Sequence, residues 1–251
     1  MYLVNEHVQP VERATLLRFQ QDHHIQLPAA YCEFVQQYGV GTYCGVLNIE
    51  RPDAQQLQEF VEYQLWENDE HSPITNEQLA ECIVIGTTID GDFLALHPQV
   101  SDLLWLPRHS TEIEVRQYDS QASWIEMMDQ WLTMSYGDSF QKIQQHRYYE
   151  SWTLSQQHRS LTFHPSEEGN NLLSISSSAE QLTQVADQIN TQLPADLKIE
   201  SPYSCLLFWR SIQGYARFNY AYGYEVALCY DDTEEEAKER LVELLLQYQI
   251  Y

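Results

Sequence analysis

The chain has 251 residues, of which 37 are Asp or Glu and 13 are Lys or Arg, so its formal net charge at pH 7 is −24. Nucleic acids and anionic membranes bind basic faces, so this charge argues against both and leaves either a basic protein partner or a simply solvated acidic surface. The acids are concentrated early, because residues 1–140 hold 22 acids and only 5 bases.

The first elements are predicted to be helical. Pro10 opens a segment through about His24, whose inward residues are expected to be Val11, Ala14 and Leu17, with Leu16 as a further candidate. Pro28 starts a second helix, in which Tyr31, Phe34, Val35 and Tyr38 recur at helical spacing. A strand is expected over residues 43–49, followed by a helix that holds Leu57, Phe60 and Val61.

Residues 82–98 predict the centre of the fold. Ile83-Val84-Ile85 is typical of a strand buried on both faces, and Phe93-Leu94-Ala95-Leu96 is a second such run. Asp90-Gly91 between them supplies the positive φ of a tight turn. Thr75 and Gln78 have the spacing of a capping box just before this hairpin.

Further strands are expected at residues 102–106 and 111–118, and then a helix capped by Asp119 or Ser120 that buries Trp124, Met127 or Met128, and Trp131. Residues 141–149 are polar and slightly basic and predict a linker or a bridging segment. We therefore expect an α+β fold with two domains, residues 1–140 and a smaller α+β unit of residues 141–251. One continuous sheet across both is the alternative.

In the second half, strands are expected at residues 149–155, 159–164, 171–176, 205–212 and 215–230, with Gly214 in the turn between the last two. Ser178 and Gln181 predict a capping box before one helix, and Thr233 and Glu236 predict the start of the last helix.

Phe218, Tyr220, Tyr222 and Tyr224 alternate within the last predicted strand. A stacking platform for single-stranded nucleic acid has this pattern, but it also needs a basic groove. A core face or a protein-contact face is therefore favoured.

Five cysteines are scattered without any Cys-x-x-Cys pair, which favours free thiols in a reducing compartment. The sequence shows no signal peptide and no run of ~20 apolar residues, so a cytoplasmic protein is expected.

No motif predicts chemistry. Asp90 and Asp92 are better explained as turn residues than as ligands of Ca²⁺ or Mg²⁺, and the acids at 231–236 as helix-start residues. The nine histidines lack zinc spacings, and no Gly-x-Ser-x-Gly elbow occurs. We expect no catalytic residues, no metal and no cofactor, and a hydrolase with a spatially assembled site is the least favoured alternative.

Residues 10–135 resemble the SUKH superfamily of immunity proteins and fungal cell-wall regulators. The resemblance lies in Leu27-Pro28-Ala29-Ala30-Tyr31, in the helix end Tyr38-Gly39-Val40-Gly41, and in Ile85-Gly86 followed by Asp90-Gly91-Asp92-Phe93. It implies an α+β domain and a protein that neutralises a cognate toxin by binding it. Leu27, Pro28, Tyr31, Gly86 and Gly91 match as fold determinants only.

The resemblance and the acid excess together predict a protein that binds a basic toxin, such as a nuclease, through surface complementarity. A regulatory scaffold for endogenous partners is the alternative, and a monomer and a homodimer both stay open. Trp66 is the expected aromatic anchor, although a core position is equally open. The expected partner-binding residues are Glu59, Glu62, Trp66, Glu67, Asp69, Glu70, Asp90 and Asp92.

Overall fold

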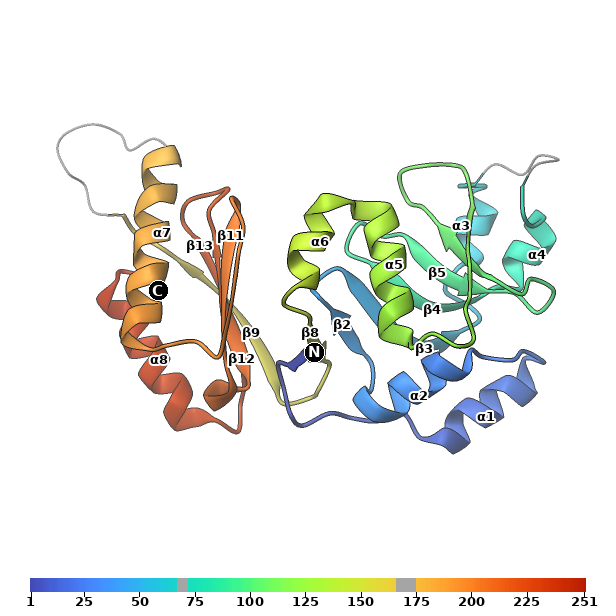
Figure 1. The fold of residues 1–251 in the computed structure, drawn as a ribbon, viewed down its shortest axis with the longest axis horizontal. Helices are drawn as coiled ribbons and strands as arrows, with labels where there is room; N and C mark the ends of the chain where they lie inside the picture. The colour runs from blue at the N-terminus through green and yellow to red at the C-terminus, as the bar shows by residue number, and fades with distance from the viewer. Residues whose placement is uncertain (67–71, 166–174) are drawn as a thin grey trace. The chain divides into compact units, whose positions relative to one another are not determined.

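The computed structural model describes residues 1–66, 72–165 and 175–251 (Figure 1). The chain forms two compact units: a continuous unit, Val8–Trp152, and a split unit that joins Met1–His7 to Thr153–Tyr251. The boundary expected at residue 140 falls inside helix α6 (Asp138–Gln144), so the division lies twelve residues later. The first seven residues belong with the C-terminal part, which local sequence patterns do not reveal.

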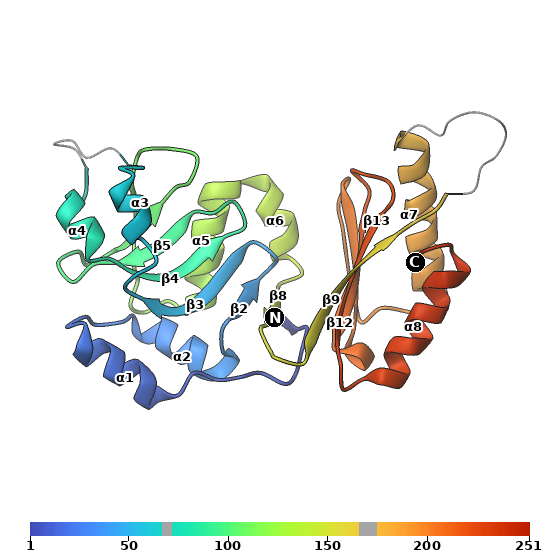
Figure 2. The ribbon, with the colours of Figure 1, turned by 180° about the vertical axis from the view of Figure 1, so that it is seen from behind.

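The continuous unit contains an antiparallel sheet with helices on both faces (Figures 1 and 2). Its strands follow the order β8-β2-β3-β4-β5-β6-β7. The strands are β2 (Gly41–Tyr43), β3 (Leu47–Asp53), β4 (Ile83–Thr88), β5 (Phe93–Leu96), β6 (Leu103–Leu106), β7 (Glu114–Arg116) and β8 (Tyr148–Ser151). The helices are α1 (Arg13–Asp22), α2 (Ala29–Tyr38), α3 (Gln58–Glu62), α4 (Asn76–Ala80), α5 (Trp124–Tyr136) and α6.

The predicted central hairpin is confirmed. β4 and β5 pair with Ile83 opposite Leu96, and Gly91 in the turn has a φ of 89°. The expected capping box at Thr75 and Gln78 is also present at the start of α4. These features depend on residues close together in the sequence, which is why the pattern alone predicts them.

Apolar side chains cover both faces of this sheet. On one face, Leu57, Trp66 and Leu79 from the α3–α4 region pack with Val84 and Phe93. Elsewhere in the unit, the rings of Tyr31 in α2 and of Trp131 in α5 each contact Trp124 edge to face, at centroid distances of 5.3 and 5.2 Å. The helices therefore bury the apolar runs that mark β4, β5 and β6.

Three local expectations in this unit were wrong. α1 begins at Arg13, and its inward residue is Leu16, whereas Leu17 is 45% exposed. The strand expected over residues 43–49 is a hairpin, because Cys44 and Gly45 both adopt positive φ between β2 and β3. The cap of α5 is Ser123 with Glu126.

The linker or bridging segment predicted at residues 141–149 contains the end of α6 and the beginning of β8. β8 pairs with β2, with Tyr149 opposite Tyr43, so this strand completes the sheet of the continuous unit. A pairing over more than one hundred residues leaves no local signal, and the polar composition of α6 was misleading.

The split unit contains an antiparallel sheet of strand order β10-β11-β12-β13-β9, and α7 and α8 cover one of its faces (Figures 1 and 2). Leu182 and Ile189 of α7 and Leu241 and Leu245 of α8 pack there against Leu207, Phe218 and Leu228. The elements of this unit are β1 (Tyr2–Leu3), β9 (Gln156–Thr162), α7 (Ile175–Gln192), β10 (Leu197–Glu200), β11 (Ser204–Trp209), the 3₁₀ turn η1 (Arg210–Ile212), β12 (Gly214–Asn219), β13 (Glu225–Asp231) and α8 (Glu235–Gln247).

The long strand expected at residues 215–230 is two strands, β12 and β13, with a turn at 220–224. Ser178 lies inside α7, and Glu234 precedes α8, so neither predicted capping box starts its helix. The strand expected at 171–176 overlaps residues outside the described part, and Ile175 begins α7. Strand pairing and tertiary contacts set these element boundaries, and local residue spacing did not predict them.

Gly86 gives a test of the central sheet. A Cβ at this position would lie 2.6 Å from the backbone oxygen of Asn48 on β3, so neither strand can yield without losing its register. We expect Gly86→Ala to lower the free energy of unfolding by about 3 kcal/mol, measured by urea denaturation.

Gly137→Ala is the control in the same unit. Gly137 has a φ of 55°, but a Cβ added there would meet no heavy atom within 4 Å, so only the backbone conformation is penalised, by about 1 kcal/mol. Equal losses of unfolding free energy in the two variants would contradict the explanation that Gly86 is needed for the close contact between β3 and β4.

Candidate functional site

The predicted acidic residues of α3 lie on the surface. Glu59 and Glu62 are both exposed, and among the described residues no Lys, Arg or His lies within ion-pair distance of either. Glu67, Asp69 and Glu70 lie outside the described residues. The described part of the predicted acidic region is therefore two exposed carboxylates on one short helix, and neither forms an ion pair with another described residue.

Asp90 and Asp92 occupy the turn between β4 and β5. Asp90 is exposed and accepts a hydrogen bond from the hydroxyl of Tyr136 at 2.9 Å. Asp92 is partly buried, and its Oδ1 accepts from the backbone N–H of Arg108 at 2.8 Å. Asp92 thus fixes the loop after β6, whereas Asp90 keeps a solvent-facing carboxylate.

Arg108 connects these two acidic elements. Its guanidinium carbon lies 5.3 Å from the ring centroid of Phe60 in α3, and Phe60 in turn contacts Phe93 at 5.0 Å. The structure therefore brings α3 and the β4–β5 turn to neighbouring positions, with one exposed cation between them.

Trp66 is a core residue. Only 2% of it is exposed, and its indole N–H donates to the backbone oxygen of Pro107 at 2.8 Å. Of the two positions left open for this residue, the structure therefore places it in the core, and it is not an accessible anchor. Tyr63, which directly follows α3 and lies four residues after Glu59, is 85% exposed. The sequence did not predict it as a contact residue, because a single tyrosine outside any periodic pattern does not indicate whether its side chain is exposed.

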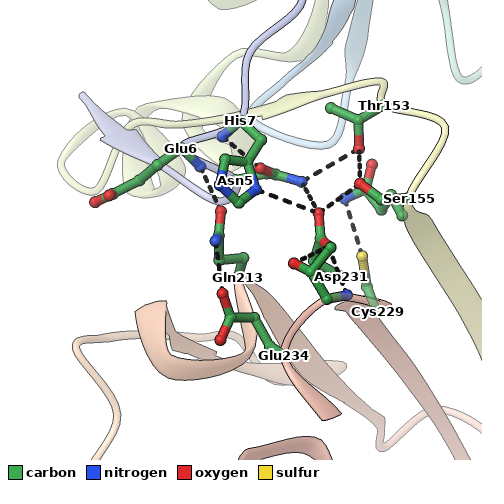
Figure 3. Close-up of polar contacts among 11 residues, drawn as sticks. Asn5, Glu6, His7, Thr153, Ser155, Gln213, Cys229, Asp231 and Glu234 are labelled. Atoms are coloured by element: carbon green, nitrogen blue, oxygen red, sulfur yellow. Dashed lines mark hydrogen bonds and ion pairs between the residues drawn. The ribbon is translucent and has the colours of Figure 1, made fainter.

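The most densely connected polar cluster lies in the split unit and centres on Asp231, at the end of β13 (Figure 3). Asp231 is completely buried. Its Oδ2 accepts from the amide of Asn5 at 3.0 Å and from the hydroxyl of Ser155 at 2.7 Å. Its Oδ1 accepts from the backbone N–H and the hydroxyl of Thr233, at 3.0 and 2.7 Å.

These donors set the charge state of Asp231. Burial alone would raise the pKa of its carboxyl, but the hydrogen bonds from Ser155, Thr233 and Asn5 outweigh burial and lower the pKa to about 2. A carboxylate offers about four lone-pair positions, and four donors occupy them. The group is therefore a structural acceptor with no position left for a metal ion or a substrate.

The cluster extends along the N-terminal segment. Asn5 Oδ1 accepts from the backbone N–H of His7 at 2.7 Å, and the His7 ring nitrogen lies 3.8 Å from Asp231. Gln213 accepts from the backbone N–H of Glu6 at 2.9 Å and donates to Glu234 at 3.1 Å (Figure 3). Side chains from β13 and from the turns beside it therefore hold residues 5–7 in place.

The cysteines are free, and their chemistry is that of buried thiols. Burial raises the pKa of Cys32 and Cys205 to about 11 and that of Cys44 and Cys82 to about 12. Because the thiolate is the nucleophile and the metal ligand, these four are unreactive at neutral pH. Within either unit, the described residues bring no three His, Cys, Asp or Glu ligand atoms together for a metal ion.

A surface hollow of about 410 Å³ lies in the continuous unit, between the segment before α2 and the end of β5. Its lining includes Leu27, Pro28, Leu96 and Tyr118 and has no acidic or basic residue other than His97. His97 is buried, and its Nδ1 accepts from the backbone N–H of Gln99 at 3.2 Å. Ser101 and Ser120 also line the hollow, but among the described residues no hydrogen bond joins either serine to His97.

Comparison of the chain with family models, with curated proteins and with solved structures found no match. Among the described helices, none has the length and apolar character needed to cross a bilayer.

Asp231 gives a prediction with a defined pH dependence. Asp231→Asn presents an amide donor to groups that already donate, so we expect the free energy of unfolding at pH 7 to fall by about 2 kcal/mol. The folded pKa of about 2 lies below the ordinary value, so the carboxylate's contribution is complete above about pH 4 and is lost as the pH falls towards 2. The stability gap between wild type and variant should therefore narrow over that range.

Urea denaturation at several pH values measures this gap. The matched control is Asp232→Asn, because Asp232 is the exposed neighbour and should change stability by less than about 0.5 kcal/mol. A gap that stays constant down to pH 2 would show that Asp231 does not carry the effect.

Proposed function

We propose that the chain is an immunity-type protein that binds and neutralises a cognate protein toxin with a basic surface. The proposal is supported by the antiparallel α+β architecture of residues 8–152, which agrees with what the SUKH resemblance implies. Leu27 and Tyr31 are buried, Tyr31 donates to the backbone oxygen of Glu50 at 2.5 Å, and Gly86 allows close strand contact. These matching residues thus act in the fold, as the resemblance implies for them.

The observation that carries the proposal is that Glu59 and Glu62 are exposed and form no ion pair with any other described residue, although Arg108 lies over Phe60 of the same helix. Glu59 and Glu62 lie on α3, and Tyr63 adds an accessible ring beside them. Unpaired surface acids attract a basic partner and raise its association rate, while an aromatic ring supplies contact area at low entropic cost. Glu59, Glu62, Tyr63 and Asp90 are therefore the proposed contact residues.

Co-expression tests the proposal directly. The gene next to this one is expressed in a bacterial host with and without the chain, and survival is compared. We expect the chain to rescue growth if the neighbouring gene encodes the toxin. A neighbouring product that is harmless, or that kills equally in both strains, would remove the immunity function and favour a regulatory scaffold.

Charge reversal tests the surface. With the purified toxin, the Glu59→Lys/Glu62→Lys variant is expected to lower the association rate at least tenfold in low salt, because it replaces attraction with repulsion. The measurement is stopped-flow or surface-plasmon kinetics at two salt concentrations, and added salt should reduce the difference.

The matched control is Glu239→Lys/Glu243→Lys, which makes the same change in net charge at two exposed acids of α8 in the split unit. Equal slowing in both variants would mean that overall charge, and not the surface around α3, guides association.

A further inference from the structure

Three tyrosines are exposed on two turns of the split unit. Tyr203 is 71% exposed in the turn between β10 and β11, and Tyr222 and Tyr224 are 55% and 51% exposed in the turn between β12 and β13. We call these three residues the tyrosine patch. Of the aromatic row noted in the sequence, Phe218 and Tyr220 are buried in the core, so the row divides into two differently placed pairs.

The two turns are joined by backbone hydrogen bonds. The N–H groups of Tyr220 and Ala221 both donate to the backbone oxygen of Tyr203, at 2.8 and 3.3 Å. The rings of Tyr222 and Tyr224 have centroids 6.5 Å apart. The patch is therefore one surface built from two turns.

Side-chain hydrogen bonds hold the backbone of each turn. Ser201 Oγ accepts from the N–H groups of Tyr203 and Ser204, at 3.2 and 3.0 Å. In the other turn, Asn219 Oδ1 accepts from the N–H of Ala221 at 3.2 Å, and Gly223 adopts a φ of 74°. Rings on a fixed backbone lose little freedom on binding, which is why Tyr on turns rich in Ser, Gly and Asn is common in protein-binding surfaces.

Two carboxylates lie beside the patch, and only one of them is paired with a cation. Glu225 follows Tyr224 and accepts from the amide of Asn219 at 3.0 Å, and Glu200 pairs with Lys198 at 2.7 Å. Arg217, further along β12, is exposed. The patch itself thus offers phenol rings with carboxylates at its border.

We propose that the tyrosine patch is a protein-contact surface for a partner segment that presents arginine side chains. A second copy of the chain also carries −24 and is repelled, so charge favours a basic partner. Guanidinium groups stack on aromatic faces more readily than ammonium groups do, because they are planar and weakly hydrated. The inference goes beyond the proposed function, because the patch and the acids of α3 lie in different units.

The test uses the full chain and two capped peptides, tetra-arginine and tetra-lysine, which carry the same charge. Binding is measured by isothermal titration calorimetry at 150 mM salt. We expect wild type to prefer the arginine peptide, and the Tyr203→Ser/Tyr222→Ser/Tyr224→Ser variant to lose fivefold to thirtyfold in affinity for it. The affinity for the lysine peptide should change much less.

Three controls separate the causes. Replacing the three tyrosines by Phe keeps the rings and should keep the arginine preference, and Leu246→Ser removes an equally exposed apolar residue of α8 without effect. Glu59→Lys/Glu62→Lys should lower the affinity for both peptides equally. A result that contradicts the proposed α3 surface can therefore be distinguished from one that contradicts the tyrosine patch. Thermal melting confirms that each variant is folded.

The proposal is overturned if the serine variant keeps the arginine preference, or if wild type binds the two peptides equally, since overall charge then explains the binding. It is also overturned if sedimentation shows a wild-type dimer that the serine variant lacks, because a second copy would then be the occupant.

Discussion

The buried carboxylate of Asp231 is the interaction on which the split unit depends. Its four donors come from three separate segments: Asn5 near the N-terminus, Ser155 before β9, and Thr233 before α8. A buried charge is tolerable only when it is fully hydrogen-bonded, so these segments have to meet for the unit to be stable. One ionised side chain thereby fixes the places where the chain leaves this unit at His7 and re-enters it at Thr153.

Contacts between distant segments, such as those of Asp231, are the parts of the fold that local sequence patterns do not predict. The β4–β5 hairpin, the Trp-rich helix α5 and the capping box of α4 depend on residues a few positions apart, and periodicity and turn chemistry suffice for them. The hydrogen bond between Asn5 and Asp231 spans 226 positions. Nothing in Met1–His7 marks it as part of the C-terminal unit, so the boundary at residue 140 followed composition and missed the pairing that defines the units.

The candidate contact surface also has a part that the sequence predicts and a part that it does not. The excess of acids is a property of composition and is visible at once, and so is their clustering near α3. Whether an aromatic residue beside them faces solvent is decided by packing. Trp66 fills the space against Phe60 and Phe93, while Tyr63 projects outward, although both lie within one turn of the acids. Helical spacing could not separate them, because α3 ends at Glu62 and Gln64 then adopts a positive φ of 50°.

The described polar groups bear on the proposed binding role. Catalytic groups need free lone pairs, shifted acidities near neutral pH and a shared cavity. Here the most perturbed carboxyl is saturated by donors, and burial holds the pKa of four thiols well above neutrality. The side chains that do remain free, such as Glu59, Tyr63 and Tyr222, lie on helix ends and turns that a hydrogen-bonded framework keeps in place. Fixed and accessible groups of this kind suit recognition of another protein, because little ordering entropy is lost when it binds.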